Sequence, residues 1–216
     1  MANKITELKR LEEEMAKDLN LPLRQSNLVF GEGNPDCEIL FIGEAPGMNE
    51  DVQRRPFVGR AGQLLRRCVR DLGWREEDVY ITNIVKRRPP DNRDPLPEEI
   101  ESYKPYLARQ IEIIGPKIIV PLGRFSMNYF LPFAKITRDQ GRLFKSGGHF
   151  ILPMLHPAAA LRGTGAMNMF EETFARLPKA LIKIESGDFQ KEELKKEERK
   201  EAEPKKKVED VQESLF

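Results

Sequence analysis

Short apolar segments alternate with longer amphipathic segments along most of this chain. The apolar segments, which predict strands, cover residues 37–42, 79–85, 117–121 and 149–154. The amphipathic segments, which predict helices, cover residues 3–19, 60–73, 97–113, 122–131 and 169–184. Strands that are separated by helices favour a parallel sheet with helices on both faces. We therefore expect an α/β fold with a central parallel sheet.

The last part of the chain has a different composition. Residues 187–216 hold 8 Lys or Arg and 10 Asp or Glu, and they contain few apolar side chains before the terminal Val-Gln-Glu-Ser-Leu-Phe. Such a segment cannot bury enough apolar surface to offset the entropy that it would lose on ordering. We expect a folded domain over residues 1–186 and a flexible charged tail over residues 187–216.

The N-terminal segment is amphipathic and charged. Its apolar residues Ile5, Leu8, Leu11 and Met15 recur at helical spacing, and no apolar stretch of the chain is long enough to span a bilayer. This segment does not have the pattern of a secretory signal. We therefore expect a soluble, cytoplasmic protein that has no membrane partner.

Unusual residues collect where the predicted strands end. The small-residue loop Gly-Glu-Ala-Pro-Gly at residues 43–47 follows the first strand, and Phe57 lies further along the same connection. Asn83 lies near the end of the second strand, and His156 follows the fourth. Because ligands of open α/β sheets bind at the carboxyl ends of the strands, these four features indicate one binding site.

Each feature also has a simpler interpretation. The glycine-containing loop could equally hold a phosphate, and Phe57 could be a core residue. Asn83 could bridge two loops, and a lone histidine such as His156 is more often structural than catalytic. Their coincidence at one edge of the predicted sheet is what favours a functional site.

Four segments of the chain, taken together, resemble the family 4 uracil-DNA glycosylases. They are GEAPG at residues 43–47, EDVQRRPFVGRAGQLL at 50–65, YITNIVKRRPPDNRDP at 80–95 and LHPAAALR at 155–162. The resemblance implies a three-layer α/β/α sandwich around a four-stranded parallel sheet. It also implies hydrolysis of the N-glycosidic bond of deoxyuridine in DNA, a step of base excision repair in which the target base is flipped into a pocket.

The resemblance implies a role for each of the residues that match the family motifs. Phe57 would stack on the flipped uracil, and Asn83 would pair with its O4 and N3–H and so reject cytosine. His156 would donate a hydrogen bond to O2 of the leaving uracil. Glu44 would act as an electrostatic or water-orienting carboxylate, because Ala45 stands where other branches of the superfamily carry a water-activating aspartate.

Other residues complete the expected site. Gly43 and Ala45 would let the base approach the loop that follows the first strand. Glu50 would crowd the C5 position of uracil and exclude thymine, which we treat as a hypothesis. Arg88 and Arg162 would contact the DNA, which could be single- or double-stranded.

The chain departs from the family at the four cysteines that bind a 4Fe–4S cluster. Alignment on the family motifs places Asp18, Leu21, Arg87 and Tyr103 at these positions, whereas such a cluster requires thiolates. The two cysteines of the chain lie elsewhere in the sequence. We therefore predict a protein without an iron–sulfur cluster, metal or other cofactor. We expect Asp18 to pair with Arg87, while Leu21 and Tyr103 fill the vacated volume.

The end of the chain resembles the short peptides that dock on DNA sliding clamps. Gln212 would be the polar anchor, and Leu215 and Phe216 would enter a hydrophobic pocket of the clamp. A flexible tether would let this peptide bind without constraining the enzyme. The alternative is a C-terminus that ends in Leu-Phe by chance.

Three other functions compete with uracil excision at this stage. The same pocket could belong to a non-catalytic module that binds damaged DNA, or to a glycosylase for other deaminated bases such as hypoxanthine or xanthine. An enzyme of nucleotide phosphates is disfavoured, because the chain lacks the Gly-Lys-Ser/Thr of a P-loop. We expect a monomer that acts on uracil-containing DNA in the nucleoid.

Overall fold

The computed structural model of the chain describes residues 3–189 and 191. They fall into two compact units, one that ends at Ala175 and one that begins at Arg176. The first unit holds the sheet and every residue of the candidate site, and the second holds helix α9 (Leu177–Glu185). The predicted division at residue 186 stays a prediction.

The sheet of the first unit has four parallel strands at its centre. These are β2 (Ile39–Gly43), β3 (Tyr80–Asn83), β4 (Ile118–Pro121) and β6 (His149–Ile151), in the spatial order β3-β2-β4-β6. All residues of β2, β3 and β4 are buried, as expected for parallel strands that are covered on both faces. The predicted α/β class and the four parallel strands are therefore confirmed.

Two short antiparallel strands extend this sheet, so the expected four-stranded parallel sheet is corrected to a mixed sheet of six strands. β1 (Glu32–Gly33) pairs with β3, and β5 (Phe144–Ser146) pairs with β6. With two and three residues, these strands are too short to show a hydrophobic period in the sequence. Gly33 brings β1 close to β3, since a side chain there would begin 2.1 Å from the carbonyl oxygen of Val79.

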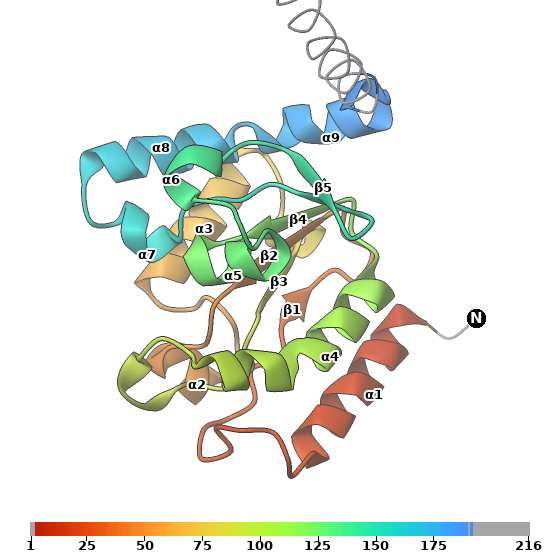
Figure 1. The fold of residues 1–216 in the computed structure, drawn as a ribbon, viewed down its shortest axis with the longest axis vertical. Helices are drawn as coiled ribbons and strands as arrows, with labels where there is room; N and C mark the ends of the chain where they lie inside the picture. Colours follow the sequence, from red (N-terminus) through yellow and green to blue (C-terminus); the bar gives the residue numbers. More distant parts are fainter. Residues whose placement is uncertain (1–2, 190, 192–216) are drawn as a thin grey trace, which may run out of the picture. The chain divides into compact units, whose positions relative to one another are not determined.

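Helices cover both faces of the sheet (Figure 1). On one face, apolar side chains of α1 (Lys4–Lys17) and α4 (Pro97–Ile114) join Leu40 and Ile42 in the hydrophobic core. The other face is covered by α3 (Arg60–Asp71) and α8 (Thr164–Phe174), and the ring of Phe174 stacks on that of Phe41 at 5.5 Å. Side chains alternate along β2, so Phe41 points away from its two neighbours.

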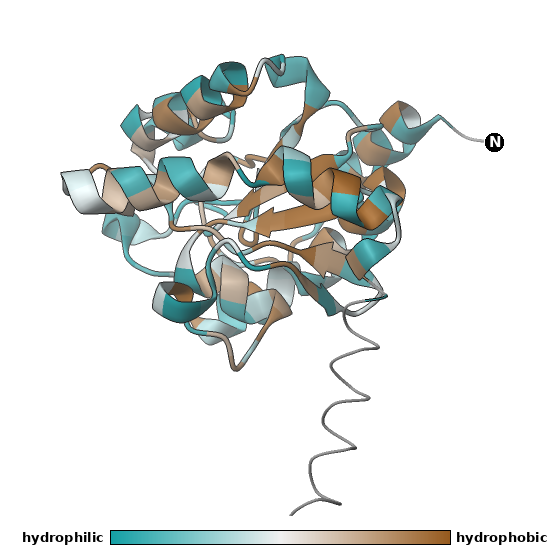
Figure 2. Ribbon diagram, turned by 90° about the horizontal axis from the view of Figure 1, so that it is seen from above, coloured by the Kyte–Doolittle hydropathy of each residue, from teal (hydrophilic) through white to brown (hydrophobic). Residues whose placement is uncertain are grey.

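The colouring of Figure 2 shows the same layers, with hydrophobic residues on the central strands and mixed helices around them. Complete burial of a side chain such as Phe41 stabilises the fold by about 1.5–3 kcal/mol. No helix of the described part of the chain is both long and apolar enough to cross a bilayer.

Short helices that the sequence did not predict lie in the connections around the site. α2 (Met48–Gln53) follows β2, and α7 (Pro157–Ala160) follows β6. The remaining elements are α5 (Gly123–Phe130), α6 (Ile136–Asp139) and the 3₁₀ turns η1 (Glu76–Asp78) and η2 (Pro90–Asn92).

The single helix predicted over residues 169–184 is two helices, α8 and α9. Pro178 lies in the first turn of α9 and has no N–H to continue the hydrogen bonding of α8.

Candidate active site

The topology opens a crevice at the carboxyl end of β2. The chain passes from β2 to β3 on one side and then to β4 on the other, and such a reversal leaves the strand ends open to a ligand. A cavity of about 330 Å³ opens at this edge of the sheet. It is lined by Glu44, Ala45, Pro46, Gly47, Glu50, Phe57, Ala61, Gly62, Asn83, Pro89, Asn92, Arg93, His156 and Ala158.

Gly43 lies directly beneath two of the predicted base-binding side chains. Its partner in the parallel register is Asn83, and the pairing continues because Ile84 N donates to the Gly43 carbonyl at 3.0 Å. A side chain on Gly43 would begin 2.4 Å from Asn83 Oδ1 and 2.5 Å from Cζ of Phe57. Glycine at this position therefore lets both side chains pack on the end of β2.

Phe57 is buried in an uncommon backbone conformation. Its φ is 53°, in the left-handed region that costs a non-glycine residue about 1–3 kcal/mol. The phenyl ring lines the cavity beside His156, with 5.8 Å between the ring centroids and 34° between the planes. The surrounding loop must hold this conformation, because the side chain alone would not favour it.

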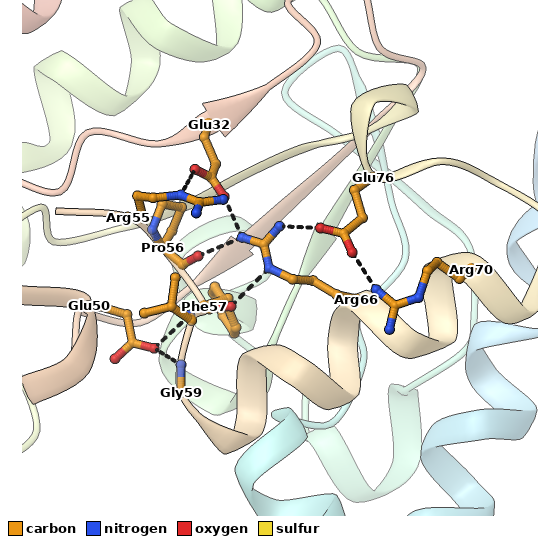
Figure 3. Close-up of polar contacts among 10 residues, drawn as sticks. Glu32, Glu50, Arg55, Pro56, Phe57, Gly59, Arg66, Arg70 and Glu76 are labelled. Carbon is orange, nitrogen blue, oxygen red and sulfur yellow. Dashed lines mark hydrogen bonds and ion pairs between the residues drawn. The ribbon is translucent and has the colours of Figure 1, made fainter. Parts of the chain in front are cut away.

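Glu50 contributes to holding that loop. Its Oε1 accepts hydrogen bonds from the backbone N–H groups of Val58 at 2.9 Å and Gly59 at 2.8 Å (Figure 3). Glu50 also lines the cavity, as the sequence predicted. Its suggested role against thymine stays a prediction, and the structure adds a structural role that the sequence did not indicate.

The carboxamide of Asn83 is free to bind a ligand. Asn83 is 2% exposed, and within the described residues no hydrogen bond reaches its side chain. Its oxygen and nitrogen are not among the fully buried unpaired atoms of the described residues, so they are accessible from the cavity that Asn83 lines. A ligand with one donor and one acceptor on neighbouring atoms would pair with this carboxamide.

The imidazole of His156 is neutral and keeps one N–H for the cavity. Its Nδ1 accepts from the backbone N–H of Ala158 at 3.2 Å, so the proton of the neutral ring lies on Nε2. Burial lowers the pKa of His156 to about 4, and the nearby Glu50 only partly opposes this shift. Gly123 lies behind the ring, where a side chain would begin 3.0 Å from Cβ of His156. His156 is therefore a neutral hydrogen-bond donor at physiological pH.

The carboxyl group of Glu44 lies at the cavity wall in a partly buried setting. Burial and, to a smaller extent, the charge of Asp94 raise its pKa to about 7, against the opposing effect of Arg124. The Glu44 carboxyl group therefore changes its charge in the neutral pH range. A positive charge that forms beside this carboxyl group favours its ionised form.

Two predicted DNA-contacting residues lie outside the cavity. The Nε of Arg88 donates to Asn92 Oδ1 at 2.7 Å, so Arg88 supports a loop that lines the cavity. Arg162 is exposed beyond α7. Asn92 and Arg93 also line the cavity, and the sequence did not assign them to the base-binding site, although both belong to the Pro-Pro-Asp-Asn-Arg segment, whose composition is typical of a turn.

A comparison with known proteins identifies the family. Residues 30–178 match the family model of the uracil DNA glycosylase superfamily, which is more than half of the chain. The chain belongs to this superfamily. The type-4 uracil-DNA glycosylase of Sulfurisphaera tokodaii is 44% identical over 187 residues, which are 81% of this chain and 85% of the relative.

Other type-4 uracil-DNA glycosylases show similar identity to this superfamily member. That of Saccharolobus solfataricus is 47% identical, over 73% of this chain and 77% of its own length. That of Thermotoga maritima is 48% identical, over 66% of this chain and 76% of its own length. The resemblance that the sequence motifs indicated is confirmed.

In this glycosylase the four positions that the sequence predicts to replace the cluster cysteines hold no thiolates. Leu21 is 5% exposed and Tyr103 is fully buried, both within the hydrophobic core, as expected. The Tyr103 hydroxyl donates to the Pro22 carbonyl at 2.8 Å and so ties α4 to the segment before β1. An aliphatic group and a buried phenol engaged in this way do not fit an iron–sulfur cluster.

The expected ion pair between Asp18 and Arg87 is wrong. Asp18 ends α1, and its carboxylate accepts from the Tyr106 hydroxyl at 2.7 Å and from the Asn20 N–H at 2.9 Å. The buried Arg87 instead donates to the Ser26 carbonyl and lies beside the Tyr103 hydroxyl, while its Nε has no partner in the described part of the chain. Asp18 points toward α4 because α1 packs against that helix.

The cysteines of the described region lie apart from these positions. Cys37 and Cys68 are buried, and burial raises the pKa of the first thiol to about 12 and that of the second to about 11. Within residues 3–189 and 191, no three His, Cys, Asp or Glu side chains are grouped so that they could hold a metal ion.

Proposed function

We propose that this chain excises uracil from DNA through the cavity at the ends of β2 and β3. The chain is a monofunctional DNA glycosylase, a hydrolase that breaks the N-glycosidic bond of deoxyuridine and leaves an abasic site. One observation carries the assignment of this cavity. A stacking ring, an unpaired carboxamide and a neutral imidazole, from three separate parts of the sequence, line the same space.

Base recognition uses Phe57 and Asn83. The flipped base stacks on the Phe57 ring, next to the small residues Gly43 and Ala45. The Asn83 carboxamide donates to O4 and accepts from N3–H of uracil. Cytosine presents the reverse order of donor and acceptor, so its binding would leave buried polar groups unpaired, and this mismatch excludes it.

His156 stabilises the leaving group. As the glycosidic bond breaks, negative charge gathers on O2 of uracil, and the Nε2–H of the neutral His156 donates to it. A preorganised donor of this kind lowers the barrier by about 3–4 kcal/mol. A neutral imidazole is suited to this task, because its proton is already in place and no charge must be buried.

Glu44 supplies negative charge on the sugar side. Breakage of the bond leaves an oxocarbenium-like sugar, which a carboxylate stabilises. The same carboxylate can orient the water that attacks the sugar. Because Ala45 has no functional group, Glu44 carries the charge that this loop offers.

Two further site roles rest on the same cavity. Glu50 crowds the C5 position and excludes thymine, while its Oε1 also holds the Phe57 loop. Arg88 and Arg162 contact the DNA. Single- and double-stranded DNA containing uracil both offer the phosphates that these side chains bind.

We also propose that the enzyme works without an iron–sulfur cluster. The donor chemistry at Asp18, Leu21, Arg87 and Tyr103 supports this, since none of these side chains is a thiolate. Iron and sulfide analysis of active protein purified without reconstitution tests it. Stoichiometric iron in that preparation would contradict the proposal.

A clamp contact and the assembly state extend the proposal. Gln212, Leu215 and Phe216 lie outside the described residues, so docking on a sliding clamp stands on the sequence alone. Removal of the last five residues is expected to abolish clamp binding and to leave excision unchanged. We further propose a monomer that acts in the cytoplasm at the nucleoid, which light scattering and imaging of a tagged chain would test.

A single assay separates this function from its competitors. A duplex with one deoxyuridine is incubated with the protein, treated with alkali and analysed on a gel, and strand breakage at that site is expected. A protein that binds the duplex without producing an alkali-labile site would be a binding module. Faster release of hypoxanthine or xanthine than of uracil would shift the assignment to other deaminated bases.

A further inference from the structure

We infer that Arg66 is a positioning residue for base recognition, which fixes the stacking ring of Phe57 by binding the carbonyl groups of Pro56 and Phe57. This inference rests on the proposed function, because it assumes that Phe57 stacks on the flipped base. Arg66 does not line the cavity, so it acts through the loop and makes no contact with the substrate base.

The guanidinium of Arg66 binds two consecutive carbonyl groups of the loop. Its Nε donates to the Phe57 oxygen at 3.0 Å, and its Nη2 donates to the Pro56 oxygen at 2.9 Å (Figure 3). These are the carbonyls of the residue with the left-handed φ and of the residue before it. A rotation of the peptide on either side of Phe57 would break one of these bonds.

Two carboxylates hold the guanidinium in place. Nη2 also donates to Glu32 of β1, and Nη1 donates to Glu76 of η1 at 2.8 Å. The Arg66 side chain is only 13% exposed, and a charge this deep needs partners on several sides. Arg66 is thus fixed by two elements that do not belong to the loop itself.

Each carboxylate is held in turn by a second arginine. Arg55 binds Glu32 through Nε at 2.7 Å, and Arg70 binds Glu76. Burial alone would raise the pKa of Glu32, but hydrogen bonds from Arg55 and Arg66 hold it below its ordinary value. Burial also acts to raise the pKa of Glu76, but hydrogen bonds and charges of the arginines, above all the hydrogen bond from Arg66, lower it below its ordinary value. Both carboxylates therefore remain charged at neutral pH.

The loop is held from its other side by Glu50. That carboxylate accepts the N–H groups of Val58 and Gly59, while Arg66 binds the carbonyls of Pro56 and Phe57. Two oppositely charged side chains thus bind four consecutive residues. Gly62 completes the fit, because a side chain there would begin 1.9 Å from the Phe57 oxygen. A strained residue persists only when its surroundings determine its conformation in this way.

A double-mutant cycle between Arg66 and Phe57 tests the inference. Single-turnover uracil release from a one-deoxyuridine duplex is measured for the wild type, Arg66→Ala, Phe57→Ala and the double variant. We expect Arg66→Ala to slow uracil release by about tenfold or more when Phe57 is present. When Phe57 is already replaced by alanine, the same substitution should slow release by less than about threefold. Equal losses in both backgrounds would overturn the inference, because Arg66 would then act independently of Phe57.

Arg70→Ala is the matched control. It removes the other arginine bound to Glu76 but touches neither carbonyl of the loop. We expect its release rate to stay within about twofold of the wild type. A loss as large as that of Arg66→Ala would show that the charged network as a whole is what matters, and would overturn the specific role of Arg66.

Base-specific affinity provides the second readout. A duplex with 2′-fluoro-2′-deoxyuridine, whose fluorine slows glycosidic cleavage, is compared with the same duplex that carries thymidine. Arg66→Ala should lower the ratio of these two affinities by about tenfold and leave affinity for the thymidine duplex within about twofold. Equal weakening of both duplexes would overturn the inference.

Arg66→Lys covers the case in which Arg66→Ala does not fold, as judged by thermal melting. One ammonium group cannot serve two carbonyls and two carboxylates at once, so an intermediate loss with the same dependence on Phe57 is expected. A lysine variant that matches the wild type in both readouts would overturn the inference. A wild type that releases no uracil would instead overturn the proposed function.

Discussion

The rings of Phe57 and His156 are neighbours in the cavity, 5.8 Å apart between centroids and inclined by 34°. A base that stacks on the first ring therefore brings its edge to the second. Asn83 reaches the same space from the end of β3. One flipped pyrimidine can meet all three side chains.

His156→Ala is expected to slow single-turnover uracil release by about 100- to 1000-fold, because one preorganised donor to the leaving base is lost. Affinity for the uncleaved 2′-fluoro analogue should change much less, since the charge on O2 develops only as the bond breaks. His149→Ala, on strand β6, is the control for loss of a histidine. Comparable losses in both histidine variants would argue against a specific role for His156.

Asn83→Asp is expected to abolish most uracil binding while it preserves the shape of the side chain. The carboxylate has no donor for O4 and repels that oxygen, so release should fall by about 100-fold or more. The measurement is single-turnover release together with affinity for an undamaged duplex, which should not change. Retention of wild-type release would mean that the carboxamide does not read the base.

The rate of uracil release is expected to rise with pH across the neutral range. The pKa of Glu44 is raised to about 7, and only its ionised form stabilises the positive sugar, so activity should be gained as pH increases through that value. His156 adds no inflection there, because its pKa is about 4 and the ring is already neutral.

Glu44→Gln provides the comparison for this pH profile. The variant should release uracil more slowly than the wild type at high pH. Its release rate should not rise with pH across the neutral range, because the amide does not titrate. A wild-type profile that is flat or falls through the neutral range would contradict the role of Glu44. So would a rise that persists unchanged in Glu44→Gln.

Gly62→Ala is expected to displace the Phe57 loop, since the new methyl group would lie 1.9 Å from the Phe57 oxygen. We expect a loss of release of about 100-fold and a lower melting temperature, because the overlap with backbone must be relieved by movement. Gly165→Ala is the control, as nothing lies within 4 Å of its added side chain and the position is helical. That control should keep full activity and match or exceed the wild-type melting temperature.

Glu50→Gly tests the exclusion of thymine. If the carboxylate blocks the C5 position, this variant should release thymine or bulkier 5-substituted uracils that the wild type rejects. Its uracil release should also slow, because Val58 and Gly59 lose their acceptor. Glu50→Gln keeps an acceptor oxygen and most of the bulk, and it should preserve the rejection of thymine. If Glu50→Gly rejects thymine as fully as the wild type does, Glu50 does not exclude thymine.

The elements with a clear hydrophobic period were predictable from the sequence. Strands β2, β3, β4 and β6 and helices α1, α3, α4 and α5 all overlap their predicted ranges, because burial on a sheet or helix imposes a regular pattern on consecutive residues. Strand β1 and helices α2 and α7 have two to six residues. Segments this short carry too few repeats to reveal a period, and tertiary pairing determines them.

The site shows the same division. That Phe57, Asn83 and His156 meet at one edge of the sheet was predictable, because Asn83 ends a strand and the other two lie in connections that follow strands. The bond from Arg66 to Glu32 joins residues that are 34 positions apart, and no local pattern connects them. The predicted pairing of Asp18 with Arg87 was wrong for a related reason. Local sequence does not determine how α1 packs against α4, and this packing turns Asp18 toward Tyr106.

The most direct measurement is the release of free uracil from a duplex with one deoxyuridine, under single-turnover conditions, by the wild type and by Phe57→Ala, Asn83→Asp and His156→Ala. We predict release by the wild type, none from matched duplexes with cytosine or thymine, and a loss of at least about tenfold in each variant. Uracil release that all three substitutions leave unchanged would contradict the assignment of this cavity as the active site.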